Sequence, residues 1–86
     1  MQGNKKQVLL KALARTVEQL RGNKSQYMLS AEYGISYSIL NSIEKGIKDP
    51  QLTTLYKLSE ALNVSFEQFI SKLIQNLPKN FYIIDK

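Results

Sequence analysis

Apolar residues recur along the chain at helical steps of three and four, and short turn signals separate the repeats. Asn4 is the predicted N-cap of the first helix, and Gly22 with Asn23 is its predicted stop. The stripe of this helix consists of Leu10, Leu13, Val17 and Leu20. Ser25 then opens a second, short helix that Gly34 ends, and its predicted inward residues are Met28 and Leu29.

The third predicted helix begins at the N-cap Ser36 and ends at Gly46. Its apolar side consists of Ile39, Leu40 and Ile43. The opposite side carries short, uncharged hydrogen-bonding groups: Tyr37, Ser38, Asn41 and Ser42. Exposed helix faces are usually rich in Glu, Lys and Arg, which favour helix more than Ser or Asn do. This face therefore suits hydrogen bonding to a partner better than plain solvation.

Two further helices follow. Asp49 and Pro50 mark a turn and the predicted start of the fourth helix, which Asn63 closes. Its stripe consists of Leu52, Leu55, Leu58 and Leu62. The fifth helix has the clearest start, because Ser65 and Gln68 have the spacing of a capping box. Its predicted inward face consists of Phe66, Phe69, Ile70, Leu73 and Ile74.

Pro78 separates these helices from a short apolar tail. The sequence therefore predicts an all-α domain over residues 1–77, with a helix-turn-helix at 25–45 and a tail at 78–86. Four tail residues are too apolar for a free end: Phe81, Tyr82, Ile83 and Ile84. They either fold onto their own domain or bury against a second subunit, for example as a strand across a two-fold axis. We expect the second arrangement, a homodimer.

Composition narrows the chemistry. The 86 residues include no cysteine and no histidine, so disulfides, thiolate metal sites and the usual general base are excluded. No phosphate-cradling glycine loop or paired carboxylates suggest an enzyme, and we expect neither metal nor cofactor. The first residues have a basic start but neither a long apolar run nor a clear cleavage site, so we expect no signal peptide. No apolar run approaches the roughly 20 residues that span a bilayer. We expect a cytoplasmic protein.

The net charge of +5 is unevenly distributed. Residues 1–48 hold eight basic and three acidic side chains, whereas residues 49–86 hold four of each. The excess lies around the unusual third helix and suggests a polyanionic partner, with ordinary solubility as the alternative. Only Gly34, Ile35 and Ser36 separate the second and third helices. So short a connection favours a helix-turn-helix, whose second helix is narrow enough for the major groove of DNA.

Residues 25–70, SQYMLSAEYGISYSILNSIEKGIKDPQLTTLYKLSEALNVSFEQFI, resemble the phage-repressor and Cro-like helix-turn-helix family, often called the XRE family. The resemblance covers about residues 10–72, with Val17, Leu20 and Arg21 matching the end of the first helix. It implies a five-helix, lambda-repressor-like DNA-binding domain. The other matching positions are Ser25, Gln26, Leu29, Gly34, Ile35, Ser36, Ser38, Leu40, Ile43, Glu44, Gly46, Pro50, Leu52, Thr54, Leu55, Lys57, Leu58, Ala61, Leu62, Val64 and Ser65.

The chain departs from the family pattern at several points. Ser30 replaces a usual alanine, and the connection from Arg21 to Ser25 is two residues shorter, with Lys24 at a normally apolar place. Tyr37 and Ser42 stand where Arg, Lys or Gln is common, which removes the bidentate arginine that reads guanine. These departures bear on the recognised DNA sequence rather than on the class of protein.

The resemblance and the helix faces together assign roles. The base-edge candidates are Tyr37, Ser38 and Ser42. The DNA-backbone candidates are Lys24, Gln26, Ser36, Asn41, Lys45 and Lys48. Glu44 would repel phosphates, and the resemblance instead implies an ion pair with Arg21.

The predicted function is a sequence-specific transcriptional regulator, a repressor that occupies a palindromic operator on double-stranded DNA as a homodimer. The alternative is an antitoxin, or another protein that binds a small protein partner through the tail and DNA secondarily.

Overall fold

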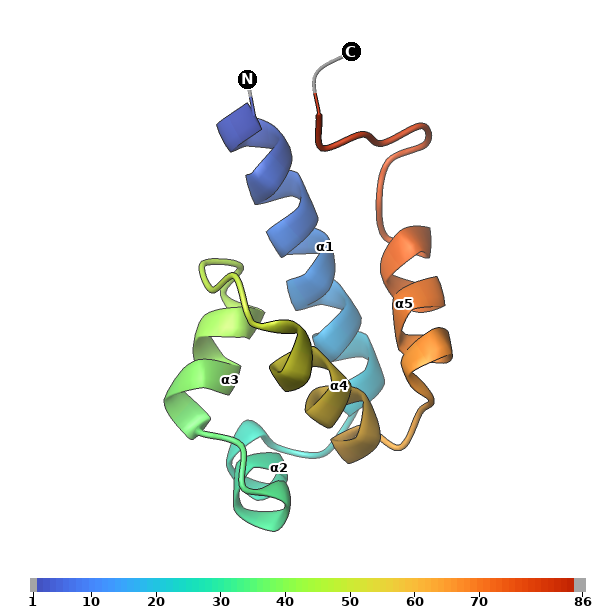
Figure 1. Ribbon diagram of the computed structural model, residues 1–86. Coiled ribbons are helices and arrows are strands. Elements are labelled where there is room, and N and C mark those ends of the chain that lie inside the picture. Colours follow the sequence, from blue (N-terminus) through green and yellow to red (C-terminus); the bar gives the residue numbers. More distant parts are fainter. Residues whose placement is uncertain (1, 85–86) are drawn as a thin grey trace.

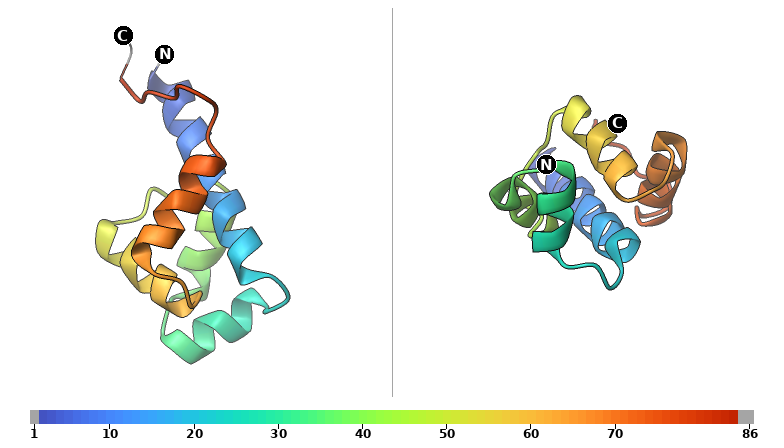
Figure 2. Two further views of the ribbon diagram at one scale, coloured as in Figure 1. Left: turned by 90° about the vertical axis from the view of Figure 1, so that its right-hand side faces the viewer. Right: turned by 90° about the horizontal axis from the view of Figure 1, so that it is seen from below.

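The computed structural model describes residues 2–84, which form five α-helices and contain no strand (Figure 1). The helices are α1 (Gln2–Arg21), α2 (Gln26–Tyr33), α3 (Tyr37–Glu44), α4 (Leu52–Ala61) and α5 (Phe66–Gln75). Seen from below, α1 lies between α2 and α3 on one side and α5 on the other (Figure 2). The predicted all-α, five-helix architecture is confirmed.

The core forms where the apolar stripes of the helices meet around α1. Leu13 and Val17 contribute from α1, and the other helices supply larger side chains that are fully buried. Those with at most 1% exposure are Leu29, Leu40, Ile43, Leu58 and Phe69. Ile39, Leu55, Ile70 and Leu73 are partly buried and pack against this cluster. The three- and four-residue periodicity thus identified most of the core correctly.

Serine residues begin three of the helices as predicted. Ser25 Oγ accepts from Met28 N, and Ser36 Oγ accepts from Ile39 N. Ser65 forms the complete capping box: its Oγ accepts from Gln68 N at 3.0 Å, and its own N donates to Gln68 Oε1 at 2.9 Å. These side chains satisfy amide groups that have no partner within the helix.

Two predicted helix starts are wrong. α1 begins at Gln2, so Asn4 lies inside the helix and is not its cap. α4 begins at Leu52 after Gln51, whose backbone is extended and whose side chain makes no capping bond, so Pro50 precedes the helix. Proline tends to hold the preceding residue out of helical conformation, but it does not oblige the next residue to enter a helix.

Three residues of the predicted apolar faces do not face inward. Met28 is 53% exposed, Ile74 is 61% exposed, and Leu52, the first residue of α4, is 68% exposed. Met28 and Ile74 each lie on an amphipathic helix whose neighbouring position, Leu29 in α2 and Leu73 in α5, packs against the core instead. Because the buried stripe of a short helix is narrow, only one of two adjacent apolar residues reaches its centre.

Neutral hydrogen bonds hold the end of α5 against α1. Thr16 is fully buried, and its Oγ1 donates to the carbonyl oxygen of Ala12 at 2.8 Å. Asn76, the residue that caps α5, donates through Nδ2 to Thr16 Oγ1 at 2.9 Å and to Gln19 Oε1 at 3.0 Å. The buried hydroxyl therefore has both a donor and an acceptor as partners, which avoids the cost of burying an unsatisfied polar group.

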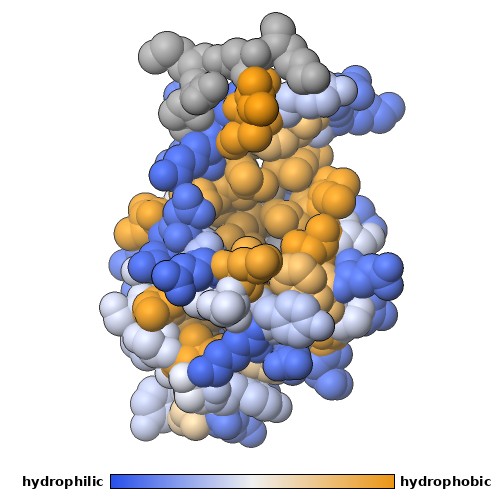
Figure 3. All heavy atoms as spheres, in the orientation of Figure 1, coloured by the Kyte–Doolittle hydropathy of each residue, from blue (hydrophilic) through white to orange (hydrophobic). Residues whose placement is uncertain are grey.

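After α5 the tail turns back toward the N-terminal end of α1 (Figures 1 and 2). Lys5 Nζ donates to the carbonyl oxygen of Ile84 at 3.2 Å, so the tail contacts its own domain. Residues 78–84 form no strand, Phe81 is half-buried, and Tyr82, Ile83 and Ile84 are exposed. Figure 3, drawn in the orientation of Figure 1, shows apolar side chains gathered over the middle of the face turned toward the viewer, below the tail.

Candidate DNA interface

α2 and α3 meet through a sharp three-residue connection. Gly34 adopts the left-handed conformation (φ 65°, ψ 29°), which a residue with a Cβ rarely enters. Ile35 then turns inward and is only 5% exposed. Ser30 Oγ donates to the carbonyl oxygen of Ile35, and Lys57 Nζ donates to that of Gly34 at 3.3 Å. The turn is therefore anchored from α2, from α4 and from the core, and it holds α3 in a defined direction.

α3 has two sharply different faces. Leu40 and Ile43 are almost completely buried, with exposures of 0% and 1%. At about 100° per residue, the predicted polar residues occupy the opposite arc of the helix: Tyr37, Ser38, Asn41 and Ser42. Tyr37 is 50% exposed and Ser38 is exposed, whereas Asn41 and Ser42 are half-buried. Tyr37 and Ser38 are therefore the most accessible of the four.

Glu44, the last residue of α3, is tied to α1. Arg21 Nε donates to Glu44 Oε2 at 2.8 Å, and Arg21 Nη2 donates to Glu44 Oε1 at 2.7 Å. The side chain of Glu44 is 4% exposed, and the hydrogen bond to it raises the pKa of Arg21 above its usual value. Arg21 Nη1 also donates to the carbonyl oxygen of Lys24 at 2.8 Å. This is the contact that the family resemblance implies, and it hides the carboxylate from the outward face of α3.

Basic and polar groups lie around α3. Lys45 caps the end of the helix, and both Lys45 and Lys48 are exposed. Gln26 is the first residue of α2 and is half-buried, while Ser36 caps α3 with its exposed hydroxyl. Helix N-termini and flanking ammonium groups are both suited to phosphate oxygens.

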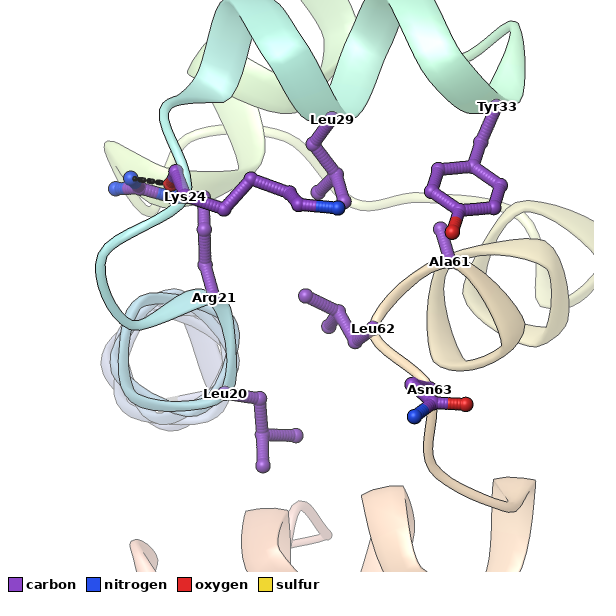
Figure 4. Close-up of a pocket in the computed structure, with 8 residues that line it drawn as sticks. All are labelled: Leu20, Arg21, Lys24, Leu29, Tyr33, Ala61, Leu62 and Asn63. Atoms are coloured by element: carbon purple, nitrogen blue, oxygen red, sulfur yellow. Dashed lines mark hydrogen bonds between the residues drawn. The ribbon is translucent and has the colours of Figure 1, made fainter.

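Lys24 has a different environment from the other backbone candidates. Its Nζ lies 2.6 Å from Glu32 Oε1 and 5.6 Å from the centroid of the Tyr33 ring, and the hydrogen bond to Glu32 raises its pKa. Figure 4 shows Lys24 across a cavity of about 440 Å³ between α1, α2 and the end of α4. The other residues that line this cavity include Leu20, Leu29 and Ala61. The charge of Lys24 is thus already balanced by a carboxylate.

The sequence alone did not reveal how far α1 reaches along α3. Gln7 Nε2 donates to the carbonyl oxygen of Gly46 at 3.0 Å, and Lys6 Nζ lies 3.7 Å from Asp49 Oδ2. Both contacts join α1 to the turn that follows α3, across about forty positions of sequence. The polar stretch QGNKKQ gave no apolar stripe by which this packing could have been predicted.

Within residues 2–84 no group of His, Cys, Asp and Glu side chains is arranged to hold a metal ion. In the same part of the chain, no helix has the length and apolar character needed to cross a membrane.

Comparison with known proteins agrees with this geometry. A family model described as "Helix-turn-helix" matches residues 17–69, from the last part of α1 to the buried Phe69 of α5. The chain belongs to the XRE family of helix-turn-helix proteins. The matched range includes every residue of α2, α3 and α4, so the family assignment rests on the site as well as on the fold.

The chain is similar to two helix-turn-helix proteins from bacteria. The "HTH-type transcriptional regulator SutR" of Escherichia coli is 37% identical over 65 residues, covering 73% of this chain and 36% of that protein. The "Uncharacterized HTH-type transcriptional regulator y4dJ" of Sinorhizobium fredii is 36% identical over 47 residues, covering 55% of this chain and 61% of that protein. The XRE chain thus spans 36% and 61% of the lengths of these relatives. No solved structure matches it significantly.

Proposed function

We propose that this protein is a sequence-specific DNA-binding transcriptional regulator that inserts α3 into the major groove. The observation that carries the proposal is the division of α3 into an apolar face, on which Leu40 and Ile43 are buried, and an uncharged polar face. Short hydroxyl and amide groups can donate to and accept from base edges, and a phenol ring can lie against a thymine methyl. Tyr37, Ser38 and Ser42 read base edges in this proposal.

The surrounding groups bind the DNA backbone. Lys45 and Lys48 supply positive charge at the end of α3. The N-terminal regions of α2 and α3 supply the remaining contacts to the DNA phosphates. The remaining backbone candidates are Lys24, Gln26, Ser36 and Asn41. Lys24 is the weakest of them, because a phosphate would have to compete with Glu32 at 2.6 Å. Both relatives are named HTH-type transcriptional regulators, which supports the regulatory role.

The proposed mode of action is repression by a homodimer that occupies a palindromic operator. A single helix-turn-helix covers few base pairs, so two copies related by a two-fold axis give useful specificity. The exposed apolar residues Ile74, Ile83 and Ile84 at the end of α5 and in the tail are the proposed dimer contacts, together with Phe81 and Tyr82. A chain ending at Leu77 should then sediment as a monomer, and a persistent dimer would exclude the tail from the interface.

Selection of bound duplexes from a random DNA pool, at a stated salt concentration, tests the main proposal. The expected result is a palindrome whose half-sites are about one helical turn apart, with affinity that falls steeply as salt rises. A Tyr37→Ala variant should select a less defined half-site, while the matched variant Tyr27→Ala on α2, 72% exposed in the native chain, should select the original one. Equal binding to all sequences would contradict a specific regulator.

A second candidate is an antitoxin-like protein that holds a small protein partner with the same tail. The exposure of Tyr82, Ile83 and Ile84 favours it. Purification from the native host distinguishes the two functions. A stoichiometric small protein that is lost when the chain ends at Leu77 would support the antitoxin, and its absence beside operator binding would support the repressor.

A further inference from the structure

The N-terminal half of α1 brings two lysines to the turn that follows α3. Gln7 bonds to the carbonyl oxygen of Gly46, and Lys6 meets Asp49. Gly46 has a positive φ of 75°, and a Cβ there would lie 3.4 Å from Lys11 Cγ, so the stem of Lys11 lies directly beside the turn. Lys6 and Lys11 thus border residues 46–49 from one side, and we call this pair the α1 basic edge.

The charges at this place are predominantly positive. Lys45 and Lys48 are exposed on the turn itself, beside the α1 basic edge. Glu44, which directly precedes Lys45, is held by Arg21, and its side chain is 4% exposed. Asp49 faces Lys6 across 3.7 Å with both side chains more than half exposed, at 60% and 66%. Four lysine residues, of which Lys11 is placed by its stem, therefore lie around this end of α3 together with one solvated carboxylate, Asp49.

The pair between Lys6 and Asp49 is weak enough for a phosphate to compete with it. Exposed ion pairs contribute about 0–1 kcal/mol and are screened by salt. Lys24 differs, since its contact with Glu32 is 2.6 Å long. Phosphates line both sides of a major groove, so a helix end that enters the groove brings its flanking turn near one of the two strands.

We infer that Lys6 and Lys11 act with Lys45 and Lys48 as a second phosphate-binding surface, beyond the α2–α3 unit. The inference rests on the proposed insertion of α3 into the major groove. Gln7 positions the surface by holding the carbonyl oxygen of Gly46. Lys6 and Lys11 are five positions apart, which is about 7.5 Å along the axis of α1. The partner of this surface is the DNA backbone, and it carries no base specificity.

The salt dependence of operator binding tests the inference. The probe is a fluorescein-labelled duplex carrying the palindrome selected from the random pool, titrated at about 50 to 200 mM salt. The variant K6Q/K11Q should reduce the slope of log affinity against log salt by about 2 per subunit, because each lost phosphate contact removes about 0.9. Asp49→Asn should act in the opposite direction and tighten binding, since it releases Lys6.

Two controls separate this role from other effects. K72Q/K79Q lowers the net charge by the same amount on α5 and in the tail, and it should leave the slope nearly unchanged. K6R/K11R keeps the charge and should keep the native slope. Sedimentation and circular dichroism of each variant show that assembly and helix content are preserved.

Equal slopes for K6Q/K11Q and K72Q/K79Q would overturn the inference while leaving groove binding by α3 intact. Tighter binding by Asp49→Asn would support it, and unchanged binding would count against the release of Lys6. A native chain that binds no DNA at all would overturn both the proposed function and the inference that rests on it.

Discussion

α3 and α5 are both short amphipathic helices, yet their outward faces differ. α3 exposes hydroxyl, amide and phenol groups and no charge, whereas α5 exposes Glu67, Gln68, Ser71 and Gln75 together with Ile74. The outward face of α5 is typical of a solvated helix, and it carries one exposed apolar residue, Ile74. The face of α3 forgoes the helix-favouring charged residues. The difference indicates that the surface of α3 serves contact with a partner more than helix stability.

Their inward faces differ as well. α3 is fixed to α1 by a bidentate ion pair between Glu44 and Arg21, and α5 is fixed to α1 by neutral hydrogen bonds through Asn76 and Thr16. Four predictions test this comparison, in order of decreasing effect on stability.

The largest effect is expected in the shared core. Leu40→Ala in α3 and Phe69→Ala in α5 each remove a side chain of 0% exposure, which should cost about 3–5 kcal/mol of unfolding free energy. Urea unfolding measures both, with Tyr27→Ala in α2, 72% exposed, as a control that should cost less than about 0.5 kcal/mol. A stable Leu40→Ala variant with altered DNA preference would show that α3 is not divided as described.

The ion pair should come next. Arg21→Ala or Glu44→Ala leaves its partner charged and largely buried, at a cost of about 3 kcal/mol. Removal of both should cost less than the sum of the single variants. A double-mutant cycle by urea unfolding measures the coupling, and additive costs would mean that the two groups act independently.

A smaller effect is expected where α5 meets α1. Asn76→Ala should cost about 1–2 kcal/mol, because it removes two hydrogen bonds and leaves the buried Thr16 hydroxyl with one partner fewer. Gln75→Ala, on the exposed side of the same turn, is the matched control and should change little. If thermal unfolding of the two variants were the same, neutral bonding would not hold α5.

The smallest effect on stability should accompany a large effect on binding. Ser38→Ala in α3 should change the unfolding free energy by less than about 0.5 kcal/mol. It should weaken binding to the selected operator by about 1–3 kcal/mol if its hydroxyl bonds to a base. Ser71→Ala in α5 is the matched control, and fluorescence anisotropy should show native affinity. Equal affinities for the two variants would remove Ser38 from the base-reading set.

Much of the fold could be predicted because its signals are local. The caps Ser25, Ser36 and Ser65 and the end of the second helix at Gly34 depend on a few neighbouring residues, and all four behave as predicted. Asn4 shows the limit of such signals. A residue type that often caps a helix does not mark the start of the helix when the residues before it are already helical. Met28 and Ile74 show another limit, because apolar character alone does not tell which of two adjacent apolar residues is buried in the core.

The candidate site divides in the same way. The polar arc of α3 follows from helical periodicity, so Tyr37 and Ser38 could be placed on the outward side from their spacing. Two other features could not be predicted, because each depends on how separate elements lie in space. They are the pairing of Lys24 with Glu32 and the approach of Lys6 and Lys11 to the turn at Gly46.

By itself, the sequence determined the helices, their caps, the buried stripes and the uncharged face of α3, because these depend on interactions within one or two turns. Only the tertiary structure decided which charges remain available. It balanced Lys24 with Glu32 and brought the start of α1 beside the end of α3. It also left the carboxylate of Glu44 only 4% exposed in the pair with Arg21 that the family resemblance implies. Charges interact through space and not along the chain, so their surplus at one end of α3 emerges only once the helices are packed.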